Sequence, residues 1–311
     1  MTADTGRAPG AQPAPVPRGL RAGLTQWHAT RDVARNLAIA CQLVSDCAAG
    51  GAEVVLLPEN GLMLGTNAEM RAAAIRLDGP EVAQLRAAAE AAGTTVVLGG
   101  AKRVTGDRTP ARNTAIVIGP DGELAGGYDK IHLFDARVGG QSFEASSVEQ
   151  AGGTPTLLRL ADTLIGLTIC YDIRFPELYR RLALAGAEVL FVPAAFTRVT
   201  GQAHWETLLR ARAIESAAYV VASATVGDDP SDAFPTYGHA LAVDPWGEIL
   251  ADLGDEPLAF SVVDLNLDTV TLTRDRMPVL RGVRPAAYAA DPVVLSVRAC
   301  PGTIQEERRH E

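Results

Sequence analysis

The hydrophobic positions of the chain form short β-branched runs that alternate with longer alanine-rich segments. A brief continuous apolar run is typical of a buried strand, and an apolar residue at every third or fourth position is typical of an amphipathic helix. Because the two patterns alternate along the whole chain, they predict an α/β fold. The expected strands lie at residues 20–26, 53–57, 94–101, 113–118, 163–169, 189–192, 219–223, 239–243 and 258–263, and the expected helices at residues 32–49, 81–92, 176–185 and 203–216.

Two segments of the first half recur, in the same order, in the second half. "GAEVVLLPE", from Gly51, returns as "GAEVLFVPA", from Gly186, and "IVIGPDGEL", from Ile116, returns as "LAVDPWGEI", from Leu241. If the halves are equivalent, each supplies a helix, a buried strand that ends in proline, and a later hairpin. Two such sheets packed face to face give a four-layer α-β-β-α sandwich with pseudo-twofold related halves. The alternative is convergence, because these turn sequences are common.

Composition narrows the functional class. The chain has 311 residues, is 47% hydrophobic and carries a net charge of −9, which argues against nucleic acid as a partner. The four cysteines follow no metal-ligand or disulfide-framework spacing, which indicates a reducing compartment. No apolar stretch is long enough for a membrane span. We therefore expect a cytoplasmic protein.

The two ends of the chain differ in composition from the part between them. Residues 1–18 are rich in proline, alanine and glycine without an apolar core, which predicts a disordered lead-in rather than a signal peptide. Residues 19–290 are expected to form one domain, and residues 291–311 a C-terminal tail.

The stretch "LTICYDIRFPEL", from Leu167, carries the first candidate for chemistry. Cys170 ends an apolar strand, and Pro176 opens a helix soon after it. A thiol at such a turn can face a cleft beside backbone N–H groups that receive an oxyanion. The alternative is a buried structural cysteine. A nucleophilic role requires a neighbouring base or cation.

Two further segments place a charged residue at an apolar flank. In "VVLLPEN" a buried strand runs into Glu59, which suits a general base; the alternative is that this residue only caps the next loop. In "GYDKIHLFD" Lys130 is suited to stabilising an oxyanion, although most lysines are solvated surface charges. His132 is the only histidine beside other candidate groups, and no local motif supports a Cys-His pair.

Together, "LLPEN", "YDKIHLFD" and "LTICYDIRFPEL" resemble the Glu-Lys-Cys triad of the carbon-nitrogen hydrolase (nitrilase) superfamily. The resemblance continues through "PAAFTRVTGQAHWETLLRARAIESAAYVV" and "YGHALAVDPWGEIL". It implies the α-β-β-α sandwich, with Glu59 as base, Cys170 as nucleophile, and Lys130 with the Tyr171 backbone N–H holding the oxyanion. It implies no metal and no organic cofactor.

One position departs from the family pattern. Members often carry a second glutamate in a Phe-x-Glu-Ser pattern between the lysine and the cysteine, whereas this chain reads "SFEASS". Alignment on Phe143 puts Ala145 at the glutamate position. We expect a one-residue shift to give Glu144 this catalytic role; the alternative is that the position is empty.

The residues after the cysteine suggest the substrate. Nitrilases of this superfamily usually read Cys-Trp-Glu, whereas Cys-Tyr-Asp resembles the Nit-type amidases, which act on carboxylate-bearing amides of the keto-acid amide or deaminated glutathione type. Arg174 is expected to bind that carboxylate, with Phe196 and Thr197 lining the same pocket. The alternative for Arg174 is a salt bridge with Asp172 or Glu177.

The resemblance also suggests an assembly and leaves two other functions open. The family helix that corresponds to residues 203–216 packs against a second subunit, which predicts a homodimer or a larger homo-oligomer. The alternative functions are an N-carbamoyl amide hydrolase with the same triad, and a catalytically silent binding protein.

Overall fold

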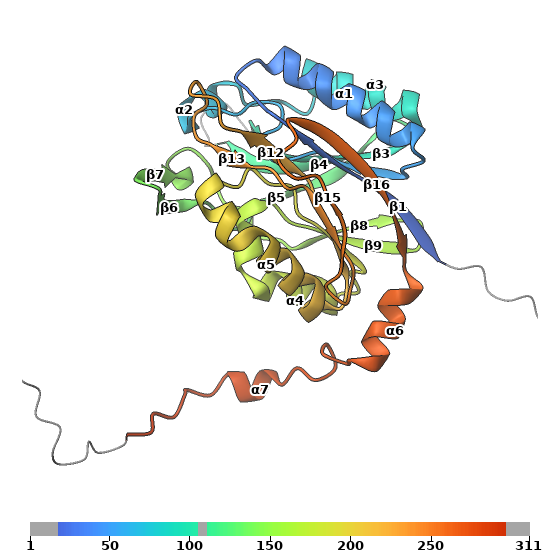
Figure 1. Cartoon of the computed structure of the whole chain (residues 1–311), viewed down its shortest axis with the longest axis vertical. Coiled ribbons are helices and arrows are strands. Elements are labelled where there is room, and N and C mark those ends of the chain that lie inside the picture. Colours follow the sequence, from blue (N-terminus) through green and yellow to red (C-terminus); the bar gives the residue numbers. More distant parts are fainter. Residues whose placement is uncertain (1–17, 105–110, 297–311) are drawn as a thin grey trace, which may run out of the picture. The chain divides into compact units, whose positions relative to one another are not determined.

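Two sheets lie face to face at the centre of the fold, with helices on both outer sides (Figure 1). The computed structural model describes residues 18–104 and 111–296. The chain divides into one unit that ends at Leu280 and a second that begins at Arg281 and contains the short helix α7 (Pro285–Tyr288). Most of the predicted lead-in and part of the predicted tail lie outside the described residues.

The first sheet has eight strands in the order β13-β12-β1-β2-β3-β4-β5, with β16 also paired to β1. The second sheet has six strands in the order β15-β14-β11-β10-β9-β8. The strands of the first are β1 (Gly19–Trp27), β2 (Val54–Leu56), β3 (Thr95–Arg103), β4 (Arg112–Ile118), β5 (Leu124–Asp129), β12 (Ala224–Gly227), β13 (Thr236–Tyr237) and β16 (Leu258–Asn266). Those of the second are β8 (Thr156–Leu160), β9 (Thr163–Leu167), β10 (Val189–Phe191), β11 (Tyr219–Ala222), β14 (Leu241–Val243) and β15 (Ile249–Asp252).

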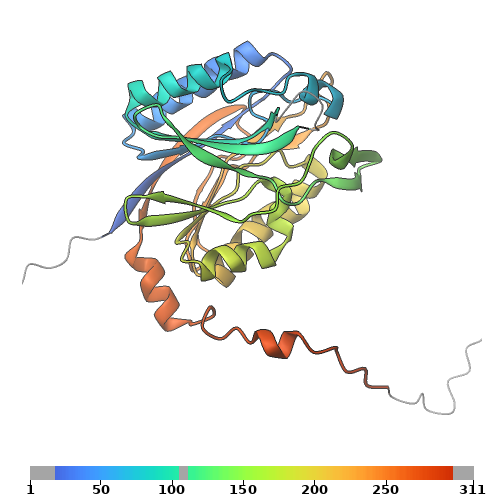
Figure 2. The same ribbon diagram turned by 180° about the vertical axis from the view of Figure 1, so that it is seen from behind.

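Helices cover the outer face of each sheet. In Figures 1 and 2, α1 and α3 lie outside the first sheet, and α4 and α5 lie outside the second. The bounds are α1 (Val33–Ala49), α2 (Asn67–Ala72), α3 (Pro80–Ala92), α4 (Pro176–Leu184), α5 (Arg198–Ser216) and α6 (Asp268–Arg276). A separate ribbon of β6 (Asp135–Val138) and β7 (Gln141–Glu144) leads into the 3-10 turn η1 (Ala145–Ser147), and a second such turn, η2 (Cys170–Arg174), precedes α4.

The internal repeats correspond to equivalent halves. Strand β2 is parallel to β1 and β3, and β4 and β5 follow as antiparallel neighbours. In the second sheet β10 is parallel to β9 and β11, and β14 and β15 follow antiparallel. The two copies of the first repeated segment contain β2 and β10. The two copies of the second segment form the turns of the β4–β5 and β14–β15 hairpins. The predicted α-β-β-α sandwich of related halves is confirmed.

Alternate residues of the central strands enter different layers of the core. In β2, Val54 and Leu56 belong to the cluster between the sheets, which also contains Ile165 and Phe191 of the second sheet. Val55, which points the opposite way, belongs to the cluster beneath α1 and α3. A strand buried on both faces reads as a continuous apolar run, which explains why β2 and β10 were predictable.

The elements missing from the sequence prediction are mainly short or lie at edges. Strands β8 and β15 close the two ends of the second sheet, and most of their residues retain exposed surface, so they lack a continuous apolar run. Helix α5 begins at Arg198 rather than at residue 203, because the Thr197 side chain accepts the Thr200 N–H as an N-cap. Position 201 within this helix requires glycine, because a side chain there would overlap Tyr237.

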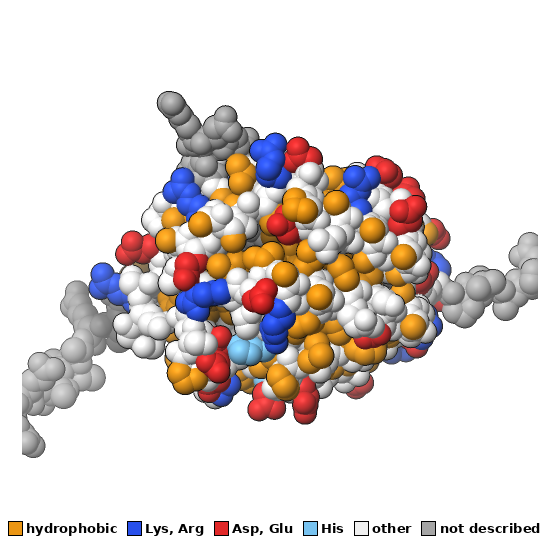
Figure 3. Space-filling view, turned by 90° about the horizontal axis from the view of Figure 1, so that it is seen from above, with side chains coloured by type: hydrophobic (Ala, Val, Ile, Leu, Met, Phe, Trp, Pro, Cys, Tyr) orange, Lys and Arg blue, Asp and Glu red, His pale blue; other side chains and the backbone are white. Residues whose placement is uncertain are grey.

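The surface carries no concentration of basic charge on the face shown in Figure 3. Lys and Arg side chains are interspersed there with Asp and Glu, and hydrophobic side chains lie between them. Among the helices that the structure describes, none is long and apolar enough to cross a membrane.

Gly99→Ala tests the close approach of the two halves. A side chain at Gly99 in β3 would overlap the carbonyl oxygen of Leu57 and the ring of Pro193, which follow the two equivalent strands β2 and β10. Overpacking of this kind lowers the free energy of unfolding by about 1–3 kcal/mol, measured by urea denaturation. Gly153→Ala is the matched control, because its side chain would meet no atom within 4 Å. Equal losses in both variants would contradict the assigned contact.

Candidate active site

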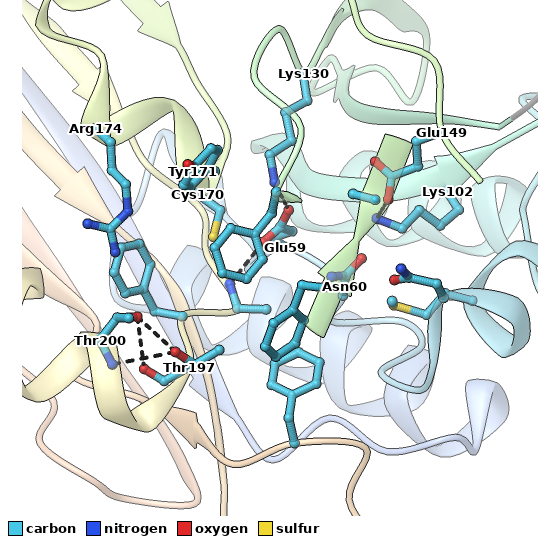
Figure 4. Close-up of a pocket in the computed structure, with 18 residues that line it drawn as sticks. Glu59, Asn60, Lys102, Lys130, Glu149, Cys170, Tyr171, Arg174, Thr197 and Thr200 are labelled. Atoms are coloured by element: carbon cyan, nitrogen blue, oxygen red, sulfur yellow. Dashed lines mark hydrogen bonds and ion pairs between the residues drawn. The ribbon is translucent and has the colours of Figure 1, made fainter. Parts of the chain in front are cut away.

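Three strand ends bring Glu59, Lys130 and Cys170 to one cavity. Glu59 follows β2, Lys130 follows β5, and Cys170 follows β9. Their side chains line one cavity, and the residues are 3%, 4% and 8% exposed. Figure 4 shows the Cys170 thiol and the Lys130 ammonium group next to the Glu59 carboxylate. The structure therefore unites the three residues that the sequence predicts as a triad.

The Glu59 carboxylate is held on both oxygens. Oε1 accepts hydrogen bonds from Lys130 Nζ at 2.6 Å and from Asn113 Nδ2 at 2.8 Å, and Oε2 accepts one from the Ala195 backbone N–H at 3.1 Å. Burial alone would raise the pKa of Glu59, but the positive charges of Lys130 and Lys102 outweigh it and lower this pKa to about 2. The carboxyl group is therefore ionised at neutral pH.

The Lys130 ammonium group also stays charged. Burial would lower the pKa of Lys130, but the nearby charges of Glu59, Cys170 and Glu149 raise it above its ordinary value. The Lys130 backbone N–H donates to the Asn113 carbonyl at 2.8 Å, so Asn113 of β4 fixes both the lysine and its carboxylate partner. Asn113 was not among the predicted site residues, because nothing in "RNTAIVI" distinguishes it from a strand-edge polar residue.

Cys170 occupies a strained turn and carries a protonated thiol. Its φ of 48° lies in the left-handed region, which a side chain other than glycine rarely adopts and which recurs at functional sites. Its N–H donates to the Pro193 carbonyl at 2.8 Å, which ties the turn to the strand end after β10. Burial and the negative charge of Glu59 raise the pKa of this thiol well above its ordinary value. The resting pair is thus a thiol and a carboxylate.

Asp172 connects the turn of Cys170 to the segment around Lys130. Its fully buried carboxylate accepts hydrogen bonds from Tyr128 Oη at 2.8 Å and the His132 backbone N–H at 3.0 Å. It also lies 2.7 Å from His132 Nδ1 and accepts from the Ile169 N–H at 2.9 Å. The segment around Lys130 is therefore fixed to the turn of Cys170. His132 bonds to Asp172 and does not line the cavity, so the structure gives no support to a Cys-His pair.

A second buried ion pair lines the same cavity. Lys102 Nζ lies 2.6 Å from Glu149 Oε1, and the two residues are 8% and 5% exposed. Neither Lys102 nor Glu149 was predicted as a site residue from the sequence. The lysine stands near the end of the apolar strand "TVVLGGAKR", which was a usable signal, whereas nothing around Glu149 indicated burial.

The structure does not bring Glu144 to the triad. Its side chain is exposed on β7 and its Oε1 accepts a hydrogen bond from Ser142 Oγ at 3.3 Å. Ala145, one residue later, is buried and lines the cavity. The expectation of a one-residue shift is therefore corrected: the position has no carboxylate, because the strand register of the β6–β7 ribbon turns Glu144 outward.

The four residues predicted to bind substrate all line the cavity, namely Tyr171, Arg174, Phe196 and Thr197. The Arg174 guanidinium lies over the rings of Tyr171 and Phe196, at 5.8 Å and 5.1 Å from their centroids, and 3.2 Å from His204 Nδ1. Within the described part of the chain Arg174 forms no ion pair, so the alternative of a bridge to Asp172 or Glu177 is not observed. Thr197 bonds to the Thr200 hydroxyl at 2.8 Å.

Aromatic side chains form another wall that was not predicted. Phe143 and Phe234 meet edge to face with centroids 5.3 Å apart, and Phe134 lies 5.0 Å from both Phe143 and Tyr171. No cluster of three or more His, Cys, Asp or Glu side chains suited to a metal ion occurs among the described residues. A thiol, a carboxylate and an ammonium group in one cavity can supply a nucleophile, a base and a partner for an oxyanion.

Comparison with known proteins identifies the family. The sequence profile described as "Carbon-nitrogen hydrolase" matches residues 21–275. The chain belongs to this family. The match spans both sheets and all three triad residues, and it confirms the expectation of a carbon-nitrogen hydrolase.

Two relatives and one solved structure illustrate the similarity. A deaminated glutathione amidase of Synechocystis is 40% identical over 264 residues, which cover 84% of this chain and 96% of that protein. A chloroplastic omega-amidase of Arabidopsis thaliana is 35% identical over 290 residues, with 91% and 78% covered. The crystal structure of the C. elegans NitFhit protein superposes with a TM-score of 0.79 at 32% identity, covering 87% of this chain and 66% of that one. The carbon-nitrogen hydrolase assignment thus rests on sequence and fold together.

The depressed pKa of Glu59 predicts a specific dependence of stability on pH. Folding lowers this pKa from 4.5 to about 2, so the ionised group stabilises the native state above pH 4.5, and this contribution is lost as the pH falls toward 2. The excess unfolding free energy of the native protein over Glu59→Gln should therefore shrink across that window, measured by urea denaturation from neutral pH to about pH 3. An excess that stays constant or grows on acidification would contradict the assignment.

Proposed function

We propose that this carbon-nitrogen hydrolase cleaves the C–N bond of a small carboxylate-bearing amide through a thioester on Cys170. The observation that carries the proposal is the shared cavity. It holds a neutral thiol, an ionised carboxylate and a buried ammonium group, with the Arg174 guanidinium beside them and not engaged by a carboxylate of the described residues. The similarity to a deaminated glutathione amidase and to an omega-amidase supports the same reaction class.

In the acylation half, Glu59 takes the Cys170 proton while the sulfur forms a bond to the amide carbon. The carbonyl oxygen becomes an oxyanion held by Lys130 and by the Tyr171 N–H, which lies in the first turn of η2. When the C–N bond breaks, Glu59 returns the proton to the nitrogen, and ammonia or an amine leaves. The product of this half is the thioester.

Lys130 explains how a carboxyl group with so low a pKa can act as a base. Burial favours the protonated form of Glu59, and the lysine charge opposes that effect. As negative charge develops on the substrate oxygen, Lys130 interacts with the oxyanion and its hold on Glu59 weakens, so the pKa of Glu59 rises while the proton arrives. In the second half, water gives a proton to Glu59 and attacks the thioester, which releases the acid and restores the thiol.

Arg174 is proposed to select the substrate by its carboxylate. A guanidinium binds a carboxylate through two parallel hydrogen bonds, and the rings of Tyr171 and Phe196 hold its plane. A keto-acid amide or deaminated glutathione meets this requirement, in agreement with the names of the two relatives.

We also propose a cytoplasmic homodimer formed through the exposed side of α5. Ile214 on this helix is 50% exposed, and it lies beside the β14–β15 turn, where Trp246 is 57% exposed. Arg210 Nε donates to the Gly247 carbonyl at 2.9 Å and fixes the turn against the helix. Exposed apolar side chains on two adjoining elements are suited to contact with a second copy of the chain.

The reaction is tested by measuring α-ketoglutarate formed from α-ketoglutaramate and from deaminated glutathione, with butyramide hydrolysis as a neutral comparison. Cys170→Ala should abolish hydrolysis of all three, a loss of about 10⁶-fold in kcat, because no other nucleophile replaces the thiol. Turnover that survives in this variant would exclude the thioester.

Arg174→Gln separates substrate selection from chemistry in the same assay. It should lower kcat/KM for the two carboxylate-bearing amides about 10- to 100-fold and leave butyramide unaffected, because only the former present a carboxylate. An equal loss for all three would show that the arginine has a structural role.

A further inference from the structure

The mechanism above does not use the buried Lys102–Glu149 ion pair. Both side chains line the reaction cavity, with 2.6 Å between Nζ and Oε1. Removing two charges from water is costly, and replacing such a pair by apolar residues is often neutral or stabilising. A buried pair that also faces a reaction cavity is therefore better explained by function than by stability.

Glu149 reaches the cavity from one turn beyond Ala145. The Glu149 backbone N–H donates to the Ala145 carbonyl at 2.9 Å, an i to i+4 bond that closes a helical turn. Residues spaced in this way project on the same side. The small side chain of Ala145 leaves space, and the next residue on that side supplies a carboxylate.

The pair interacts electrostatically with the triad. The negative charge of Glu149 contributes to the raised pKa of Lys130, and the positive charge of Lys102 contributes to the lowered pKa of Glu59. Figure 4 shows Lys102 and Glu149 on one side of the Glu59 carboxylate and Arg174 on the other. The reacting centre therefore lies between a cation suited to a substrate carboxylate and a second charged pair.

Glu149 presents a second carboxylate to the cavity. Lys102 Nζ lies 2.6 Å from its Oε1, whereas the Glu59 carboxylate accepts hydrogen bonds from the protein on both oxygens. Among the described residues that line the cavity, Glu59 and Glu149 are the two carboxylates. An amide substrate brings N–H donors into this space, and a charged acceptor binds them more strongly than Asn or Thr oxygens do.

We propose that Glu149 accepts a hydrogen bond from the N–H of the scissile amide and that Lys102 is the positioning residue that keeps this carboxylate ionised and oriented. The inference rests on the proposed amide hydrolysis and names the residue that recognises the nitrogen side of the substrate. Arg174 and Glu149 would then bind opposite sides of the bond that breaks.

The test compares an amide with the methyl ester of the same acid, α-ketoglutaramate against 5-methyl α-ketoglutarate. Both give the same acyl group, but the ester has no N–H to donate. Glu149→Gln should lower kcat/KM about 10- to 100-fold for the amide and leave the ester nearly unchanged. The ratio of kcat/KM for the amide to kcat/KM for the ester reports acylation, because kcat/KM covers the steps up to loss of the amine or alcohol. Glu144→Gln, which changes an exposed carboxylate on the neighbouring strand, should leave the ratio unchanged.

A second variant tests the inference if Glu149→Gln does not fold. Glu149→Gln leaves Lys102 as a buried charge without its partner, which is destabilising. The double variant Lys102→Met/Glu149→Met removes both charges and should show the same selective loss for the amide. Amide and ester rates that fall together would overturn the inference and assign the pair a structural role.

Failure of the proposed function has a different signature. In that case the native protein hydrolyses neither compound, or hydrolysis persists in Cys170→Ala, whatever residue stands at position 149. If the native protein hydrolyses neither compound, the result contradicts the proposed function and the inference that rests on it.

Discussion

The ion pair between Glu59 and Lys130 is the interaction on which the site depends. Its 2.6 Å contact is buried, and it keeps the carboxyl group ionised against the effect of burial. Burial and the same carboxylate raise the pKa of the Cys170 thiol and keep it protonated. In the proposed reaction, Cys170 therefore becomes reactive only when a substrate carbonyl gives Lys130 a second negative partner.

The repeated halves of the fold explain how this pair is assembled. The first copy of the repeated segment ends in Glu59, and the second ends in Ala194. The second copy thus contributes backbone where the first contributes a side chain: Ala195 N–H donates to the Glu59 carboxylate, and the Pro193 carbonyl accepts from Cys170 N–H. Related sheets bring equivalent strand ends together, and the presence of Glu59 where the second copy has Ala194 places a carboxylate at their junction.

The sequence was informative at Glu59 and Cys170, which follow apolar runs, and at Lys130, which stands against an apolar flank. The two central strands β2 and β10 were predictable because burial on both faces leaves a continuous apolar pattern. Edge strands such as β8 and β15 keep exposed surface, so their pattern is weak. Glu149 was missed because its burial follows from a single helical turn after a ribbon. Spacing along the chain did not indicate that turn. It made Glu144 resemble the second glutamate of the family pattern.

The measurement that tests the account most directly is the pH dependence of Cys170 alkylation by iodoacetamide in the free protein, followed on the Cys170 peptide by mass spectrometry. Only the thiolate reacts. Burial and Glu59 raise the thiol pKa above its ordinary value of 9.0. The rate of alkylation should therefore be low at neutral pH and should increase with pH, with no plateau around neutrality. In Glu59→Gln the rate at a given pH should be higher. A fast rate that is independent of pH around neutrality would reveal a resting thiolate and contradict the central claim.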